Sequence, residues 1–296
     1  MDIRMHINGK TVTARSGETI LDLLLRQGIH VPTLCHLPGL QPTGACRLCV
    51  VEAEGQEGLL PACSHPVADD LSILTHSPRV MAARKRTLEL LLANHPENCL
   101  HCHRNGTCEL QALASSLHIH ERRIPGFARE KKKDTTSAAL VLDHNLCVLC
   151  GRCVKVCADL MDLHALTMAG RGQASIISTS LGKGLELSAC TACGQCTLYC
   201  PTGAIRERSE TRDVIDWLTR PGHQATIMVS PVAASSIGGS PRNGSGKALQ
   251  GSLFSLLKAA GFHRVMDAAA GADLYVSLTA DLLSERLDAD DLPPLY

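Results

Sequence analysis

CVLCGRCVKVC at residues 147–157 and CTACGQCTLYCP at residues 190–201 are two copies of one pattern. Each copy has three cysteines at intervals of three residues and a fourth cysteine four residues later, and 32 residues separate the copies. A zinc site does not need four thiols within eleven residues. A cubane iron–sulfur cluster, in contrast, takes three closely spaced thiolates and a fourth from a distant part of the chain. The pattern therefore favours two [4Fe–4S] clusters over zinc or disulfides.

The repeat resembles that of two-cluster ferredoxins, in which the fourth cysteine of each run ligates the other cluster. Proline follows both fourth cysteines in that pattern, whereas here Pro201 follows Cys200 but Ala158 follows Cys157. We expect a different local turn at Cys157, with ligation retained. The resemblance implies that Cys147, Cys150, Cys153 and Cys200 hold one cluster and that Cys190, Cys193, Cys196 and Cys157 hold the other.

The remaining cysteines also point to metal binding. The chain has 15 cysteines among 296 residues, and an odd number would leave one thiol unpaired in a disulfide framework. All of them lie between Cys35 and Cys200, so the last 96 residues contain none. Met1 leads into a charged strand pattern and not into a signal peptide. We therefore expect a cytoplasmic, reduced protein whose thiols bind metal.

Charge and hydropathy exclude two classes of partner. The formal net charge is zero, which predicts no affinity for nucleic acid or for an anionic membrane surface. The longest uncharged stretch, residues 223–240, is rich in Ser and Gly and contains Pro231, so it makes a poor membrane span. We expect a soluble protein.

The first 77 residues predict a small domain rich in β-structure. Residues 3–7 alternate, Asn8-Gly9 is a strong hairpin signal, and a helix is expected from about Ser16 to Gln27. Four cysteines are set into this frame, one close pair and two on separate loops. Such a set suits a two-iron cluster held between loops, and a structural zinc site is the alternative. These cysteines are Cys35, Cys46, Cys49 and Cys63.

A second candidate site follows a helix predicted from Pro78 to near Asn94. Cys99, Cys102 and Cys108 lack a fourth ligand, and His95 lies four residues before the first of them. A lone histidine is more often an ordinary core or surface residue, but the missing ligand singles out His95. Exchanging a thiolate for neutral imidazole would make a cluster less negative and raise its reduction potential. The basic residues 121–133 are interpreted as a solvated linker, with a docking patch as the alternative.

Both of these sites resemble those of known families. The spacing Cys-x10-Cys-x2-Cys-x13-Cys, with PTGACRLC at residues 42–49, resembles the [2Fe–2S] domain of NADH dehydrogenases and [FeFe]-hydrogenases. The spacing His-x3-Cys-x2-Cys-x5-Cys resembles the histidine-ligated [4Fe–4S] site of the same families. Residues 1–210 together resemble the N-terminal electron-transfer region of multi-cluster [FeFe]-hydrogenases and the related large iron–sulfur subunit of NADH dehydrogenases. The resemblance implies one [2Fe–2S] and three [4Fe–4S] clusters.

The C-terminal part carries a weaker resemblance. Strands are expected at residues 225–229 and 264–267, with a helix at 247–260 between them, and these resemble the opening of the hydrogenase catalytic domain. No cysteine follows Cys200 to hold an H-cluster, so we expect no hydrogenase activity from the chain itself. The predicted fold is a modular α+β protein. Its expected modules are a β-grasp [2Fe–2S] domain (1–77), a helical His/Cys cluster domain with the basic linker (78–138), a two-cluster ferredoxin-like domain (139–210) and a truncated α/β tail (211–296).

A chain with clusters and no recognisable substrate site predicts an electron conductor, whose chemistry belongs to its partners. The resemblance implies the relay subunit of a soluble, NAD(P)-linked, flavin-containing oxidoreductase complex, with electron bifurcation as an option. Expected partners are an NAD(P)-binding flavoprotein, a thioredoxin-like [2Fe–2S] subunit, and a catalytic subunit of the formate dehydrogenase, hydrogenase or transhydrogenase type, or a ferredoxin. The alternatives are a free-standing ferredoxin-like carrier and a sensory or assembly protein that uses the tail as an interaction surface.

Overall fold

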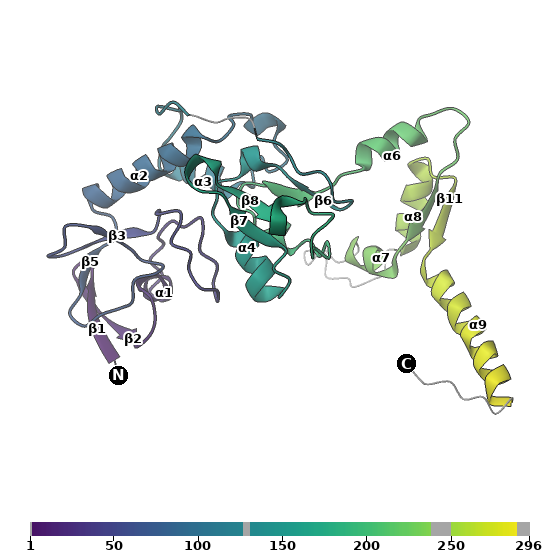
Figure 1. Ribbon diagram of the computed structural model, residues 1–296, viewed down its shortest axis with the longest axis horizontal. Helices are drawn as coiled ribbons and strands as arrows, with labels where there is room; N and C mark the ends of the chain where they lie inside the picture. The colour runs from purple at the N-terminus through teal and green to yellow at the C-terminus, as the bar shows by residue number, and fades with distance from the viewer. Residues whose placement is uncertain (1, 127–130, 238–249, 289–296) are drawn as a thin grey trace. The chain divides into compact units, whose positions relative to one another are not determined.

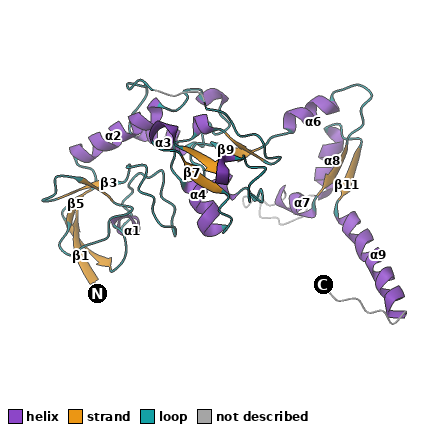
Figure 2. Cartoon of the chain, viewed as in Figure 1, coloured by secondary structure: helices purple, strands orange, loops and turns teal. Residues whose placement is uncertain are grey.

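The computed structural model describes residues 2–126, 131–237 and 250–288 (Figure 1). The chain divides into two compact units, Met1–Arg208 and Ser209–Tyr296. Helices and strands are interspersed along both units (Figure 2). The predicted mixture of α and β structure is confirmed.

The first unit begins with a five-stranded sheet in the order β2-β1-β5-β3-β4. β1 runs parallel to β5, and the other neighbours are antiparallel. Asn8 and Gly9 have φ values of +50° and +79°, as a two-residue hairpin turn between β1 and β2 requires. The predicted hairpin is therefore confirmed. The strands are β1 (Asp2–Ile7), β2 (Lys10–Arg15), β3 (Val50–Ala53), β4 (Leu59–Pro61) and β5 (Ser72–Leu74).

Helix α1 (Ile20–Arg26) packs its apolar face into the same core as the sheet. It begins later than Ser16, because Thr19 is its N-cap and forms a capping box with Asp22. Leu21, Leu23 and Leu24 of the helix are fully buried in one cluster with residues of β1 and β5. This core supports the loops on which the first cysteines lie.

Helix α2 (Pro78–Ala93) starts and ends where the sequence predicts. Ser77 caps its N-terminus through the backbone N–H of Val80, and Pro78 occupies the first turn. Its Arg84 is almost fully buried and donates a hydrogen bond to the carbonyl of Val50 at 2.8 Å. That bond ties α2 to β3. A short 3₁₀ turn η1 (Cys99–His101) and helix α3 (Glu109–Ser116) follow.

The cysteine repeat lies in the last part of the first unit. β6 (Leu140–Leu142) pairs with β9 (Ile205–Glu207), and β7 (Leu166–Ala169) forms an antiparallel pair with β8 (Ile176–Thr179). The β7–β8 pair occupies the segment between the two cysteine runs, where no strands were predicted. Each run enters a short helix, α4 (Arg152–Lys155) or α5 (Gln195–Tyr199). The remaining short turns are η2 (His144–Leu146), η4 (Gly172–Ala174) and η5 (Ser180–Gly182).

The two fourth cysteines have different backbone conformations. Cys157 lies within a π-helical turn, η3 (Val156–Leu160), that continues directly from α4. Cys200 instead ends α5 with φ −71° and ψ 117°, because a residue before proline is biased away from helical dihedrals. Ala158 imposes no such bias. The different turn expected at Cys157 is confirmed.

The second unit contains a two-stranded parallel sheet, β10 (Thr226–Val229) and β11 (Arg264–Asp267), and both strands were predicted. Its helices are α6 (Thr211–Leu218), α7 (Pro231–Ile237), α8 (Gln250–Ala259) and α9 (Ala269–Asp288). Residues 247–249 of the helix predicted at 247–260 lie outside the described residues, and the rest corresponds to α8. No helix in the described ranges has both the length and the apolar character of a membrane span.

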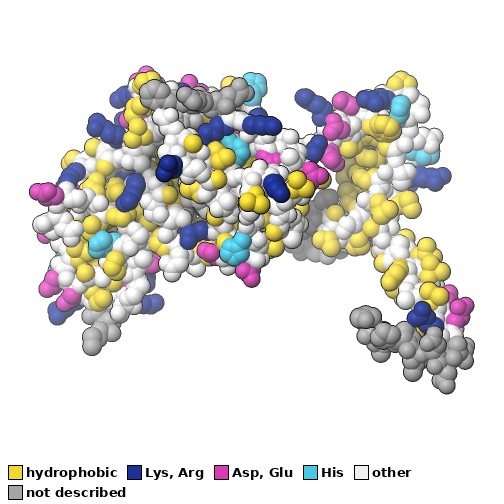
Figure 3. Space-filling view, viewed as in Figure 1, with side chains coloured by type: hydrophobic (Ala, Val, Ile, Leu, Met, Phe, Trp, Pro, Cys, Tyr) yellow, Lys and Arg dark blue, Asp and Glu magenta, His cyan; other side chains and the backbone are white. Residues whose placement is uncertain are grey.

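Apolar side chains remain exposed on this second unit. Leu274, Tyr275 and Val276 of α9 are each more than 60% exposed. Met228 and Met266 are partners across β10 and β11, and both are about half exposed or more. Hydrophobic atoms are visible over α9 and beside β11 in the space-filling view (Figure 3). Soluble proteins seldom leave contiguous apolar surface uncovered unless it meets a partner.

Candidate metal centres

The first four cysteines converge on one buried place, here named the Cys35 site. Cys35 lies on the loop after α1, Cys46 and Cys49 flank a turn before β3, and Cys63 follows β4. Each is at most 6% exposed. The N–H of Cys46 donates to Cys35 Sγ at 3.5 Å, and Arg47 adopts φ +55° in the turn between the close pair. A positive φ at a non-glycine residue is uncommon and marks a constrained loop.

The thiols of the Cys35 site interact with one another. Hydrogen bonds from the thiols of Cys46 and Cys63 lower the pKa of Cys35. A hydrogen bond from Cys63 likewise lowers the pKa of Cys49 to about 7. The pKa values of Cys46 and Cys63 rise, first because each donates its proton to a neighbouring sulfur. The site therefore favours the thiolate, the form of cysteine that binds metal, at Cys35 and Cys49, while Cys46 and Cys63 keep their protons.

The second group is named the Cys99 site and comprises His95, Cys99, Cys102 and Cys108. The three cysteines interact electrostatically, and burial is the main cause of a raised pKa at Cys108. Cys108 is also the N-cap of α3, and the nearby backbone N–H groups of Gln111 and Leu110 oppose that rise in pKa. Helix N-termini stabilise negative charge in this way.

His95 follows directly on the end of α2. Its Nδ1 lies 3.0 Å from the carbonyl oxygen of Pro96, an arrangement that favours a proton on Nδ1. Its Nε2 is buried and makes no hydrogen bond of good geometry in the described part of the chain, while the backbone of Leu146 lies close enough to the ring to oppose the lowering of the His95 pKa. Metal-binding histidines commonly donate one ring N–H to a carbonyl and present the other nitrogen to the metal. Burial, the largest influence, lowers the pKa of His95 and favours this neutral form.

The two cysteine runs line two separate cavities. One is lined by Cys147, Cys150, Cys153 and Cys200 and is named the Cys147 site. The other is lined by Cys157, Cys190, Cys193 and Cys196 and is named the Cys190 site. Each cavity thus receives three cysteines from one run and the fourth from the other run. The structure thus brings together, around each cavity, the four cysteines that the resemblance to two-cluster ferredoxins assigns to one cluster.

The two runs repeat in backbone conformation as well as in sequence. Leu149 and Ala192 both have φ +55°, and their N–H groups donate to Cys147 Sγ and Cys190 Sγ at 3.4 Å. Gly151 and Gly194 have φ +76° and +74° and cap α4 and α5. N–H groups directed at sulfur are one means by which a protein adjusts cluster potential.

Burial dominates the titration of the thiols in these cavities. It raises the pKa of Cys150 and of Cys196 to about 12, and it raises that of Cys153 well above its ordinary value. At Cys150 the N–H and the charge of Arg152 oppose the rise. Buried thiols gathered around a cavity are costly to ionise together. A cationic iron centre among them would remove that cost.

The cysteine-bearing loops of the first unit pack against one another. One apolar cluster contains Cys35 and Cys46 from the first site, Cys150 from the third and, at its margin, Cys108 from the second. Thr43, on the loop before Cys46, donates to the carbonyl of Cys150 at 3.5 Å. The N–H of Glu109, directly after Cys108, donates to the carbonyl of Pro201 at 3.0 Å. The Cys147 site therefore adjoins both of the preceding sites.

The donor sets fit iron–sulfur clusters. Sulfurs gathered at each site, N–H groups directed at sulfur, and a buried imidazole nitrogen without a partner suit such clusters, and Cys99 and Cys193 are the exposed members of the donor sets. Within the described ranges, no three His, Cys, Asp or Glu side chains converge closely enough to hold a single metal ion. His101, which is assigned no ligand role, is exposed.

The basic residues 121–133 do more than form a solvated linker. Arg122 pairs with Glu97 at 2.8 Å and donates to the carbonyl of His95. Lys133 pairs with Asp143 at 2.8 Å. Among the described residues of this segment, Arg123, which pairs with its near neighbour Glu121, and the exposed Lys132 fit the linker interpretation. The composition of residues 121–133 does not reveal these contacts, because the partner residues lie elsewhere in the sequence.

Three family models match the first unit. Residues 1–78 match a 2Fe-2S iron-sulfur cluster binding domain, residues 84–123 an NADH-ubiquinone oxidoreductase-G iron-sulfur binding region, and residues 138–206 the ferredoxin-like domain of NADH-quinone oxidoreductase subunit 3. Together with the thiol-lined sites, these matches define an iron–sulfur electron-transfer protein.

Three similar proteins indicate which kind of iron–sulfur protein this chain is. The NADP-reducing hydrogenase subunit HndD of Solidesulfovibrio fructosivorans is 34% identical over 95% of this chain and 49% of its own length. The NADPH-Fe(3+) oxidoreductase subunit alpha of Geobacter sulfurreducens is 36% identical over 69% of this chain and 24% of its own. A solved chain of an NAD+-reducing [NiFe]-hydrogenase is 31% identical, with a TM-score of 0.65, over 70% of this chain and 88% of that one. The chain belongs to this family of iron–sulfur subunits of NAD(P)-linked oxidoreductases. It spans about half the length of the first relative and about a quarter of the second.

Proposed function

We propose that this chain is an electron relay within an NAD(P)-linked, flavin-containing oxidoreductase complex. One [2Fe–2S] cluster is assigned to the Cys35 site and one [4Fe–4S] cluster each to the Cys99, Cys147 and Cys190 sites. When bound, the clusters accept and pass on single electrons. The chain's own residues hold them, exclude water from them and set their potentials.

The observation that carries the proposal is the division of the eight repeated cysteines between two cavities. Cys200 joins the cavity of the first run, and Cys157 joins that of the second. A mononuclear zinc site has no need of this exchange, because its ligands are usually two local pairs. The packing of the Cys35 and Cys99 sites against the loop of Cys150 supports relay rather than separate structural roles. The modular boundaries after residues 77, 138 and 210, and the β-grasp assignment of the first module, belong to the same proposal.

The proposed partner subunits follow from the proposed role as an electron relay. We assign an NAD(P)-binding flavoprotein and a thioredoxin-like [2Fe–2S] subunit to one side of the relay, and a catalytic oxidoreductase subunit or a ferredoxin to the other. Residues 201–296 contain no cysteine, so this segment supplies no thiolate ligand. The exposed apolar residues of α9 suit the second unit for docking to such a subunit.

Native purification and reconstitution test the proposal. Anaerobic isolation of the complex from its source cells should identify a flavoprotein among the subunits. NADH or NADPH should then bleach the cluster absorbance of this chain only when that flavoprotein is present. Cys200→Ser serves as a control, since it damages one relay site and leaves the surface unchanged. Bleaching by NAD(P)H without any flavoprotein, or none with it, would contradict the proposed role.

A further inference from the structure

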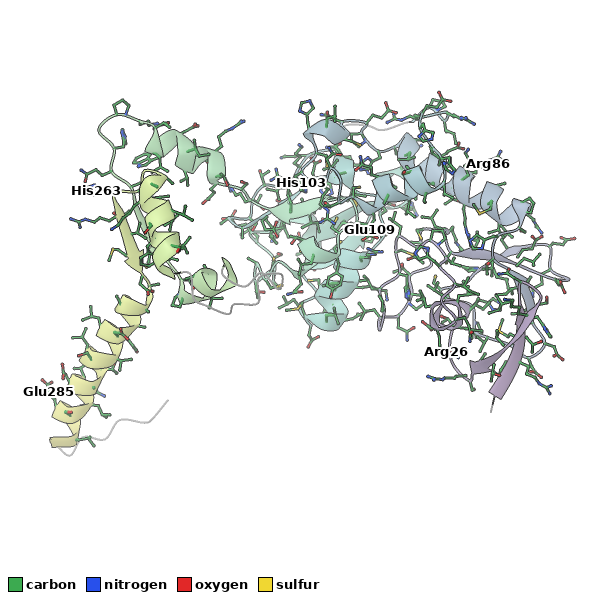
Figure 4. The ribbon with its side chains drawn as sticks, turned by 180° about the vertical axis from the view of Figure 1, so that it is seen from behind. Arg26, Arg86, His103, Glu109, His263 and Glu285 are labelled. Atoms are coloured by element: carbon green, nitrogen blue, oxygen red, sulfur yellow. The ribbon has the colours of Figure 1, made fainter. Side chains whose placement is uncertain are left out.

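A buried arginine lies between two cysteines of the Cys147 site. Arg152 occupies the position between Gly151 and Cys153, and its side chain is only 8% exposed. Its Nη1 lies 2.7 Å from Oε1 of Glu109, an ion pair that joins α4 to α3. A buried cation is costly unless it is paired, so this contact is a specific feature of the fold. Figure 4 labels Glu109 within the first unit.

Each member of the pair adjoins a different site. Arg152 is two residues after Cys150 and one before Cys153, and both of these cysteines line the cavity of the Cys147 site. Glu109 follows Cys108 of the Cys99 site and begins α3. The same pair therefore carries a positive charge into one site and a negative charge to the border of the next. The guanidinium is buried, whereas the side chain of Glu109 is 43% exposed.

The pair leaves one donor unused. The Nε–H of Arg152 is buried and has no acceptor among the residues that the structure describes. Buried donors are rarely left without a partner, because the lost hydration costs about 1–3 kcal/mol. The protein thus buries a charged donor group, one residue before Cys153, whose Nε–H none of the described residues satisfies. A sulfur-rich, anionic group in the Cys147 site has the required chemistry.

We propose that the Arg152–Glu109 pair sets the reduction potential of the cluster in the Cys147 site. The inference rests on the proposed function, because it assumes a [4Fe–4S] cluster on those four cysteines. Reduction adds one electron to the cluster and neither forms nor breaks a bond. The added negative charge is stabilised by the guanidinium of Arg152 and opposed by the carboxylate of Glu109. Arg152 and Glu109 are thus positioning and tuning residues, not cluster ligands.

A redox titration of the full, cluster-loaded chain tests the inference. Dithionite supplies the electrons, and electron paramagnetic resonance follows the signal that Cys200→Ser abolishes. In Glu109→Gln the opposing charge is lost, so we expect the midpoint potential of that cluster to rise. A tenfold change in the one-electron equilibrium corresponds to about 59 mV. Asp159→Asn is the matched control, because it breaks the Lys155–Asp159 pair of the same region, and it should leave this potential unchanged.

Two substitutions of Arg152 separate the effect of its charge on the potential from the effect of its packing. Arg152→Lys keeps the cation and should hold the potential near that of the wild type, whereas Arg152→Gln should lower it. An unshifted or lowered potential in Glu109→Gln, with the iron content of the wild type, would overturn the inference. So would equal potentials in Arg152→Lys and Arg152→Gln. A wild-type chain without iron is a different outcome, since it would contradict the proposed function itself.

Discussion

Arg122 donates a hydrogen bond through Nη2 to the backbone carbonyl of His95 at 2.6 Å. The same guanidinium pairs with Glu97 at 2.8 Å. Residues 95–97 are therefore held from outside by a side chain 27 positions further along the chain. The contact fixes the turn from which His95 presents its buried, unpartnered Nε2. A positively charged residue assigned to a linker by composition thus supports a candidate ligand.

Arg122→Ala should weaken the Cys99 site without removing any ligand. A hydrogen bond from a charged donor contributes about 1.5–3 kcal/mol, so we expect partial loss of the cluster and faster loss on exposure to chelator. Iron content and the spectrum of the histidine-ligated cluster measure the effect. Arg123→Ala is the control, because Arg123 is exposed and, among the described residues, pairs only with Glu121. Equal cluster retention in the two variants would contradict the role given to Arg122.

The sequence was sufficient for features that depend on local pattern. The Asn8-Gly9 turn, the Ser77 and Pro78 start of α2, and the strands β10 and β11 need only nearby residues to be recognised. The altered turn at Cys157 was also predictable, since proline restricts the residue before it.

Features that depend on distant partners were not predictable. The β7–β8 pair between the cysteine runs lacks a strong turn dipeptide, and α9 has no sharp apolar stripe. The contacts of Arg122, Lys133 and Arg152 join residues between 10 and 43 positions apart. In the sequence these three residues can be recognised only as positively charged, because no nearby residue indicates which carboxylate or carbonyl each of them contacts. The grouping of cysteines around each cavity was predictable because metal chemistry constrains their spacing, whereas the residues that support these loops are constrained only by packing.

Substitutions of His95 test whether its imidazole is a ligand of the cluster in the Cys99 site. If its imidazole completes the Cys99 site, His95→Cys should keep four irons there and lower the potential, because a thiolate adds negative charge. His95→Ala should lose an iron or the whole cluster. His101→Ala should leave the cluster nearly unchanged, since that side chain is exposed. Mössbauer spectra and redox titrations of the three variants decide between these outcomes. An intact cluster with an unshifted potential in His95→Ala would place the fourth ligand elsewhere.

The metal content of the chain follows from the ligand count. Two irons at the Cys35 site and four at each of the other three predict about fourteen irons per chain, with a similar amount of acid-labile sulfide. Anaerobic purification followed by elemental analysis measures both. Zinc in place of iron would remove the assignment of clusters at every site. Removal of the metal should also lower stability, because the buried thiols would then have to remain protonated around open cavities.

A substitution of Gly203 tests whether the loops of the Cys99 and Cys147 sites are in contact. It has φ +71°, and a Cβ at this position would lie 2.3 Å from Cγ of Arg104 and 2.6 Å from Nε2 of His103. Gly203→Ala should therefore lower stability by more than the roughly 1–2 kcal/mol of a left-handed residue alone. Gly55→Ala is a matched control, since Gly55 has φ +74° and nothing within 4 Å of the added atom. Thermal unfolding of the loaded chains measures the difference, and equal losses would show that the loops are not in contact.

The exchange of fourth cysteines gives the sharpest test of the two ferredoxin-like cavities. Serine is a poor substitute for a thiolate ligand, so Cys200→Ser should damage the cluster of Cys147, Cys150 and Cys153, although Cys200 belongs to the other run. The cluster of the Cys190 site should stay intact in that variant. Cys157→Ser should give the reverse pattern, because its sulfur lines the cavity of the second run. Signals assigned by single substitutions at Cys147 and Cys190 identify which cluster is lost. If each fourth cysteine instead supported the cluster of its own run, Cys200→Ser would remove the signal that depends on Cys190, and the crossed assignment would be wrong.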